Sequence, residues 1–245
     1  MTALRIMIMA MFAATSAVVV GIGSVLPLQP VFIWHAGLMI VAWTFLLPLG
    51  ALMARFFKVM PGQDWPRVLD NKVWWHAHIW LQYAGVLLAT AAMLLVVEAQ
   101  GFSLSGTHAR FGICALALGW GQIVSGLLRG TKGGPTGATM RGDHYDMTAR
   151  RRMFEAVHKP VGWLSFAIAV AAVQTGLELA GAPAWLIVLA FGPSAIVLVA
   201  FAVFTRRGLR IDTYAAIWGP SPALPTDRSE SAAAATRQRQ RDPGR

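Results

Sequence analysis

Histidine is the residue type whose positions in this chain most clearly indicate chemistry. Four of the six histidines lie near the start of four successive apolar segments, one in each: His35, His78, His108 and His158. Imidazole is a common transition-metal ligand, so one histidine per segment can supply a set of ligands from neighbouring helices. A histidine near a helix end can instead be an interfacial residue with a hydrated tip. That alternative explains one such residue better than it explains four.

The segments that carry these histidines are long enough to span a membrane. Six apolar stretches occur at about residues 4–27, 31–54, 74–97, 108–128, 160–180 and 184–205. Each is close to the ~20 residues that a spanning helix needs. Few charges interrupt them, whereas soluble core helices carry a polar stripe. We therefore predict an all-α fold, a polytopic membrane helix bundle with six transmembrane helices.

The composition of the chain agrees with this prediction. Its 245 residues are 56% apolar and 13% charged, against roughly a quarter charged in ordinary soluble domains. The mean hydropathy of the chain is +0.55. Together these values exclude a soluble globular enzyme.

The Lys and Arg residues indicate how the helices are oriented. If both termini lie in the cytoplasm, every basic residue except Arg110 falls on the inner side of the membrane. This is the positive-inside pattern of a multi-pass protein, and we expect a cell membrane, such as the bacterial inner membrane. The net charge of +10 is then a topology signal, and nucleic acid is not an expected partner.

The first apolar segment has two interpretations. Arg5, the apolar run after it and the small residues Ala13–Ala17 also resemble a signal peptide. Cleavage there would leave five transmembrane helices. The run continues to Pro27, beyond the ~7 to 15 residues of a usual signal core, which favours a retained helix. In either case the segment at 31–54 begins outside.

The last residues of the chain differ from the rest. Residues 219–245 contain Pro, Ser, Ala and Arg and almost no large apolar groups. Such a composition cannot bury enough apolar surface to fold. We therefore divide the chain into a transmembrane domain, residues 1–218, and a disordered cytoplasmic tail, residues 219–245.

Helix direction sorts the four histidines into two pairs. Alternate helices run the same way, so His35 and His108 share the outer level while His78 and His158 share the inner level. The two levels are separated by roughly 20 Å of helix. A planar cofactor held between two imidazoles at each level would form an electron path across the membrane. Haem b suits these ligands, and an iron with two axial imidazoles has no open site, which favours electron transfer over oxygen chemistry.

Basic residues flank both pairs. Arg110 follows His108 by two residues and can either pair with an outer haem propionate, attract an anionic substrate, or simply lie at the interface. Lys72 and Arg152 precede the inner pair. Topology control explains these two, and the functional alternative is binding of a haem propionate or of an anionic reductant.

Two further features concern how a cofactor would be held. His76 is the rival of His78, because residues two apart on a helix face different ways and only one of them can be the ligand. Gly112 and Gly162 each follow a proposed ligand by four residues, and Gly85 follows His78 by seven. Each glycine could leave room for a porphyrin, although glycine is also common in membrane helix contacts.

The second apolar segment resembles the cytochrome b561 family, and most closely the membrane domain of its DOMON-linked and bacterial members. Residues 35–56 match that family's His-Gly-x-Leu-Met…Trp…Leu-x-Pro-x-Gly…Ala-Arg-Tyr/Phe pattern. Further matching residues follow in the next helices: His78 with Gln82, His108 with Gln122, and an Arg-Arg-x-Phe approach to His158. The resemblance covers about residues 31–205. A departure is Gln174, where the family usually has Asn.

The resemblance implies two non-covalent haem b groups, each bound by two histidines. Carried over to this chain, the ligands are His35 with His108 and His78 with His158, which selects His78 over His76. The implied function is transmembrane electron transfer by an oxidoreductase of the ferric-chelate or ascorbate-type reductase class. The alternative is a haem-containing membrane anchor that relays electrons between a quinol and a separate periplasmic redox partner.

These two functional hypotheses define the partners that we expect. They are the lipid membrane, a cytoplasmic electron donor that is either ascorbate or a quinol, and an outer acceptor such as a ferric chelate or a periplasmic redox protein. A homodimer is a further candidate assembly.

Overall fold

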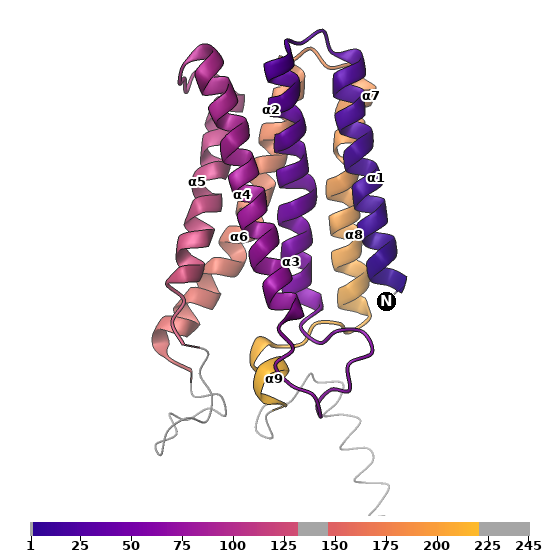
Figure 1. The fold of residues 1–245 in the computed structure, drawn as a ribbon, viewed down its shortest axis with the longest axis vertical. Coiled ribbons are helices and arrows are strands. Elements are labelled where there is room, and N and C mark those ends of the chain that lie inside the picture. The colour runs from indigo at the N-terminus through magenta and orange to yellow at the C-terminus, as the bar shows by residue number, and fades with distance from the viewer. Residues whose placement is uncertain (1, 132–146, 221–245) are drawn as a thin grey trace, which may run out of the picture.

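The computed structural model describes residues 2–131 and 147–220, and this part of the chain is helical with no strand. The helices run side by side along the long axis of the molecule (Figure 1). Their bounds are α1 Thr2–Val25, α2 Pro30–Ile40, η1 Val41–Leu46, α3 Leu47–Phe56, α4 Val73–Gln100, α5 Thr107–Leu127, α6 Ala149–Leu179, α7 Ala184–Ala190, α8 Gly192–Arg206 and α9 Thr213–Trp218.

The six predicted membrane segments are confirmed as helices. Within the described ranges, six helices are long and apolar enough to cross a membrane. The second of these is continuous through α2, η1 and α3, and the sixth combines α7 with α8. The predicted disordered tail lies outside the described residues, except for its first two residues.

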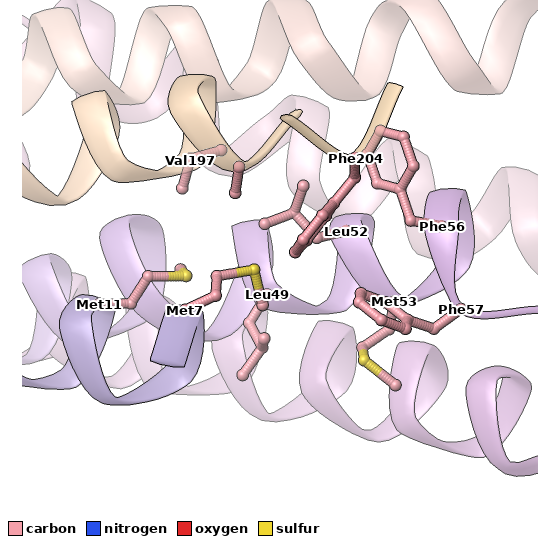
Figure 2. Packing of buried hydrophobic residues seen from close by; sticks show 10 residues of the cluster. Met7, Met11, Leu49, Leu52, Met53, Phe56, Phe57, Val197 and Phe204 are labelled. Atoms are coloured by element: carbon pink, nitrogen blue, oxygen red, sulfur yellow. The ribbon is translucent and has the colours of Figure 1, made fainter. Parts of the chain in front are cut away.

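Four of the spans form the part of the bundle that carries the histidines. The second span packs against α4, and α5 packs closely against α6. Helices α1 and α8 lie together along one side of this group (Figure 1). At the inner half, α1, α3 and α8 meet in a core of methionine, leucine and phenylalanine (Figure 2). Its labelled residues are Met7, Met11, Leu49, Leu52, Met53, Phe56, Phe57, Val197 and Phe204.

The second span contains a single π-helical turn, η1. Here the N–H of Leu47 donates to the carbonyl of Ala42, five residues earlier. Pro48 follows directly and has no N–H to donate, so the regular hydrogen-bond ladder is interrupted at this point. Beside this turn, Gln82 Nε2 of α4 donates to Leu47 O at 2.9 Å and joins α4 to the second span. The sequence pattern gave no signal for the π turn.

Two elements differ from the predicted boundaries. The fifth span begins at Ala149 rather than near residue 160, because the Thr148 side chain caps it by accepting the N–H of Arg151. The short helix α9 was not predicted. It follows the last span and lies beneath the inner ends of α3 and α4 (Figure 1). The Asp212 side chain caps α9 by accepting the N–H of Tyr214.

Candidate functional site

The outer histidine pair joins α2 to α5. The ring centroids of His35 and His108 are 6.1 Å apart, and the ring planes are inclined by 86°. His35 Nδ1 lies 2.8 Å from the carbonyl oxygen of Ala92 on α4, and His108 Nδ1 lies 2.9 Å from that of Ala172 on α6. A carbonyl only accepts, so each Nδ1 carries the proton and donates it. In both rings Nε2 keeps a free lone pair for a metal.

The inner pair joins α4 to α6. The ring centroids of His78 and His158 are 6.5 Å apart at an interplanar angle of 78°. His78 Nδ1 donates to Gly50 O at 3.0 Å. His158 Nδ1 lies 2.8 Å from Ser125 Oγ, and that hydroxyl donates its only proton to Gln122 O at 2.9 Å. Ser125 Oγ therefore accepts from His158, which again leaves Nε2 unprotonated.

The spacing of both pairs fits two imidazoles that share one metal ion. With a metal–nitrogen bond of about 2 Å on each side, the two ring centroids lie roughly 6 Å apart, close to the observed 6.1 and 6.5 Å. No group of three or more His, Cys, Asp or Glu residues that could hold a metal occurs in the described ranges. A metal bound here by two imidazoles needs another group to fill its remaining positions, as a porphyrin does.

The two pairs lie at different depths, as the sequence predicted. On α4, His78 belongs to the inner pair, whereas the carbonyl of Ala92 meets His35 of the outer pair. The helix between these two residues rises by roughly 20 Å. The hydrogen bonds also connect the two levels. Helices α4 and α6 carry the inner histidines and accept hydrogen bonds from His35 and His108 of the outer pair. Helix α5 carries His108 of the outer pair and accepts from His158 of the inner pair through Ser125.

A cavity of about 1390 Å³ opens at the inner pair and is lined by both of its histidines. Its lining is positively charged overall. The basic residues are Arg55, Lys58, Arg129, Arg151, Lys159 and Arg210, and the acidic residues are Glu155 and Asp212. Two guanidinium nitrogens, Arg55 Nε and Arg151 Nη1, are buried there without a hydrogen-bond partner. Such donors are costly to bury alone, so the cavity is suited to an anionic group.

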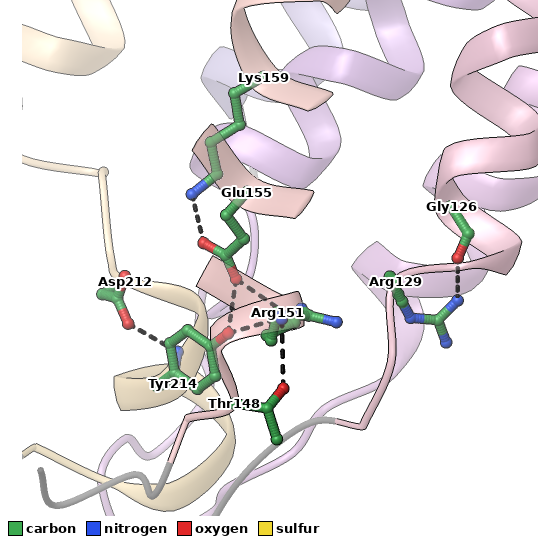
Figure 3. Close-up of polar contacts among 8 residues, drawn as sticks. All are labelled: Gly126, Arg129, Thr148, Arg151, Glu155, Lys159, Asp212 and Tyr214. Carbon is green, nitrogen blue, oxygen red and sulfur yellow. Dashed lines mark hydrogen bonds and ion pairs between the residues drawn. The ribbon is translucent and has the colours of Figure 1, made fainter. Parts of the chain in front are cut away.

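A polar network forms one wall of this cavity (Figure 3). Arg151 Nε donates to Glu155 Oε1 at 3.2 Å and to the Tyr214 hydroxyl at 2.9 Å. Tyr214 in turn donates to Glu155 Oε1 at 2.7 Å, and Lys159 Nζ lies 2.6 Å from Glu155 Oε2. Burial and the adjacent carboxylate raise the pKa of Tyr214, so its hydroxyl remains a donor. The network attaches α9 to α6 and neutralises Glu155.

Lys58 is a second buried contact between the cavity and the segment before α9. Its residue is 9% exposed, and Nζ donates to Ile211 O at 2.9 Å. Burial, only partly offset by the carboxylate of Asp212, lowers the pKa of Lys58 to about 8. This ammonium group therefore loses its charge near the upper end of the physiological pH range.

The structure brings together some of the residues predicted from the sequence and separates others. His76 is exposed and belongs to neither pair. Arg110 is exposed and donates to Leu104 O at 3.3 Å. Lys72 and Arg152 are exposed and do not line the cavity, since Lys72 pairs with Asp70 at 3.8 Å and Arg152 donates to Met147 O.

Arg55 and Arg151 line the cavity instead. From the sequence, Arg151 has the same two interpretations as Arg152, topology control or binding of an anionic group, whereas Arg55 counts as a topology signal and as part of the family pattern. The burial of Arg151 depends on α9, which the sequence did not predict. Arg151 is buried because Tyr214 of α9 covers it, and a helix of six residues leaves little periodicity to detect.

Glycines close to the histidines serve different purposes. Gly162 lines the inner cavity, whereas a Cβ at Gly85 would lie 2.6 Å from Leu47, so Gly85 allows helix packing rather than cofactor access. A Cβ at Gly112 would meet nothing within 4 Å. Gly176 was missed in the sequence: a Cβ there would lie 2.8 Å from His108 Cε1. Only glycine at this position leaves room for the His108 ring.

Comparison with known proteins places these features in a family. A family model described as eukaryotic cytochrome b561 matches residues 34–181. A cytochrome b561, DM13 and DOMON domain-containing protein of Arabidopsis thaliana is 32% identical over 152 residues, which is 62% of this chain and 15% of that protein. Ferric-chelate reductase 1 of Mus musculus is 32% identical over 157 residues, or 62% of this chain and 24% of that protein. No solved structure matches the chain.

The human ferric-chelate reductase 1 gives a similar result, with 30% identity over 149 residues, 60% of this chain and 22% of the relative. The chain thus corresponds to less than a quarter of the length of these relatives. The family match nevertheless covers more than half of the chain and includes all four histidines of the two pairs. The predicted resemblance is confirmed, and the chain belongs to the cytochrome b561 family of haem b-binding, electron-transferring membrane proteins.

Proposed function

We propose that the chain carries electrons across a membrane through two haem b groups, each held by two histidines. His78 and His158 hold the entry haem, and His35 and His108 hold the exit haem. The observation that carries this proposal is the hydrogen bonding of the four rings. Every Nδ1 is fixed as a donor to a neighbouring helix, so every Nε2 is left free within its pair.

Haem b supplies the one-electron chemistry, and the residues of the chain hold and orient it. Nδ1 donation fixes the tautomer and the plane of each ring before the metal binds, as the partners of metal-bound histidines generally do. Arg55 and Arg151, each of which has one buried nitrogen without a partner, bind carboxylates of the inner haem or an anionic donor beside it.

The donor enters at the inner cavity and the acceptor is reduced at the outer pair. The basic lining of the cavity favours an anionic donor such as ascorbate. The relatives named ferric-chelate reductase support a ferric chelate as the acceptor. The distribution of Lys and Arg supports cytoplasmic termini, and we assign the protein to a cell membrane of the bacterial inner-membrane type.

The alternative function is a membrane anchor that passes electrons from a quinol to a periplasmic redox protein. The exposed aromatic side chains at the outer end, Trp34 and Phe102, are compatible with a docking partner but also with the membrane interface. The two functions differ in whether the purified chain reduces a soluble acceptor unaided.

The first test is a haem count by pyridine haemochromogen assay on detergent-purified protein, together with a reduced-minus-oxidised visible spectrum. We expect two low-spin haems b per chain, and a chain with no haem after expression with excess haem would refute the proposal. The protein is then placed in liposomes with ascorbate inside and a ferric chelate outside. Reduction of the chelate supports the reductase, whereas reduction only after adding a quinol and a redox partner supports the anchor.

A further inference from the structure

The layer of the bundle between the two histidine levels contains a buried cluster of small or aliphatic side chains and one indole. On the second span this layer lies between His35 and Gly50, whose carbonyl meets His78. On α4 it lies between His78 and Ala92. The buried cluster in this layer consists of Ala42, Trp43, Leu47, Val86, Ala89, Ala115, Leu116 and Ala169. Its one aromatic member is Trp43.

Trp43 reaches from the second span to α5. The residue is 6% exposed, and its ring forms part of the cavity lining at the inner pair. A Cβ placed on Gly119 of α5 would lie 3.4 Å from the far edge of the indole and 3.4 Å from Val86 Cγ2. The absence of a side chain at Gly119 thus lets the indole lie close to the α5 backbone. The indole is thus packed into the buried cluster between the two levels.

The π turn is the element that carries this residue. Trp43 lies within η1, and π turns inside α-helices occur frequently at functional sites. Thr44 next to it bonds its hydroxyl to Ile40 O at 2.8 Å, so the polar side chain is satisfied within the span.

We propose that Trp43 carries the electronic coupling between the two haem levels; this rests on the two-haem function proposed above. Electron transfer between the two histidine levels, which are roughly 20 Å apart along α4, occurs by tunnelling. Tunnelling is faster through closely packed bonded atoms than across a gap. With haem bound, His78 and His158 would hold the group that gives up one electron, and His35 and His108 would hold the group that takes up the same electron. The indole is neither oxidised nor deprotonated.

The test compares three variants of the full haem-loaded protein. Trp43→Leu removes the aromatic ring, and Trp43→Phe keeps a smaller one. The matched control is Trp120→Leu on α5, one residue after Gly119, because Trp120 is 38% exposed and bonds Thr90 Oγ1 through its indole nitrogen instead of entering the cluster. Haem content, reduction potentials and the electron paramagnetic resonance spectrum are measured for each variant. The rate of electron equilibration between the haems is then followed after flash photoreduction, with the outer haem assigned through His108→Ala.

We expect all three variants to keep two haems with unchanged potentials. Trp43→Leu should slow the equilibration by an order of magnitude, Trp43→Phe should slow it less, and Trp120→Leu should leave it at the wild-type rate. A Trp43→Leu protein with both haems and the wild-type rate overturns the inference. If Trp43→Leu loses a haem, the test uses Trp43→Phe instead: slower equilibration in that variant supports the inference, and the wild-type rate overturns it. A wild-type chain without two haems overturns the proposed function, and the inference with it.

Discussion

The outer and inner histidine pairs have nearly the same spacing but are held by different kinds of acceptor. At the outer pair both Nδ1 groups donate to backbone carbonyls, those of Ala92 and Ala172. At the inner pair one acceptor is again a carbonyl, but the other is the hydroxyl of Ser125, which His158 shares with the backbone of α5. The inner pair also borders a large basic cavity.

This difference shows which pair can be tuned by mutation. A backbone carbonyl is present whatever the side chain, so the outer rings are fixed by the fold and change only if a helix moves. The orientation of His158 depends on one side chain and is therefore open to substitution. The surroundings differ in the same sense, since the cavity beside the inner pair is lined by side chains whose charge can be altered.

The largest expected effect is the loss of one level without the other. His108→Ala should remove the outer haem completely and leave the inner haem, because the inner pair takes no ligand from this residue. The haem count per chain should fall from two to one by pyridine haemochromogen assay. His76→Ala, which alters an exposed histidine two residues from a ligand, is the matched control and should keep both haems. Loss of both haems in His108→Ala would show that the two levels are not independent.

A second prediction concerns the outer pair and Gly176, the glycine beside His108. Gly176→Ala places a Cβ 2.8 Å from His108 Cε1, and such overpacking typically costs about 1–3 kcal/mol. We expect a partly empty outer site and a normal inner one, read from haem content and thermal unfolding. Gly121→Ala on α5, where a Cβ meets nothing within 4 Å, is the control. Full outer-haem occupancy in Gly176→Ala would mean that His108 does not need its present position.

Ser125→Ala tests the tunable partner of the inner pair. It removes the hydroxyl that accepts from His158 Nδ1, and losing such a partner typically weakens metal binding by about 10–100-fold. Haem titration of the apoprotein should show a weakened inner site and an unchanged outer site. Ser125→Thr keeps the hydroxyl and should restore binding. Equal inner-site affinity in Ser125→Ala and the wild type would remove the proposed distinction between the pairs.

The smallest expected effect is a pH dependence at the inner cavity. Burial lowers the pKa of Lys58 to about 8, so its positive charge disappears as the pH rises through that value. The KM for an anionic reductant should therefore increase above about pH 8, and Lys58→Met should lack this change. The charged groups that act on Lys58 are Asp212, Lys159, Arg55 and Glu155.

The same shift has a consequence for stability with a defined sign. The folded pKa of Lys58 lies below its ordinary value of 10.5, so the unfolded chain binds more protons between about pH 8 and 10.5. The contribution of Lys58 to stability should rise with pH in that window and be unfavourable below it. Thermal unfolding of wild type and Lys58→Met across the window measures this, and parallel curves would contradict the prediction.

Much of the fold followed from the sequence because the bilayer imposes it. Spans of about 20 apolar residues are required by membrane thickness, and one histidine per span then determines the pairing by direction alone. The tight contact at Gly176 and the burial of Arg151 did not follow. Both depend on a distant residue, His108 in one case and Tyr214 in the other, and no local pattern encodes such a neighbour.

The π turn in the second span also bears on how this protein can change length during evolution. A π turn accommodates one residue more than the α-helical turn it replaces. The side chains before and after the turn therefore keep their directions around the helix axis. Loss of one residue within Val41–Leu46 would therefore restore a plain α-helix with His35 and Gly50 still directed as they are. Loss of a residue elsewhere between them would rotate one against the other by about 100°. Insertions and deletions among relatives should accordingly gather at this turn.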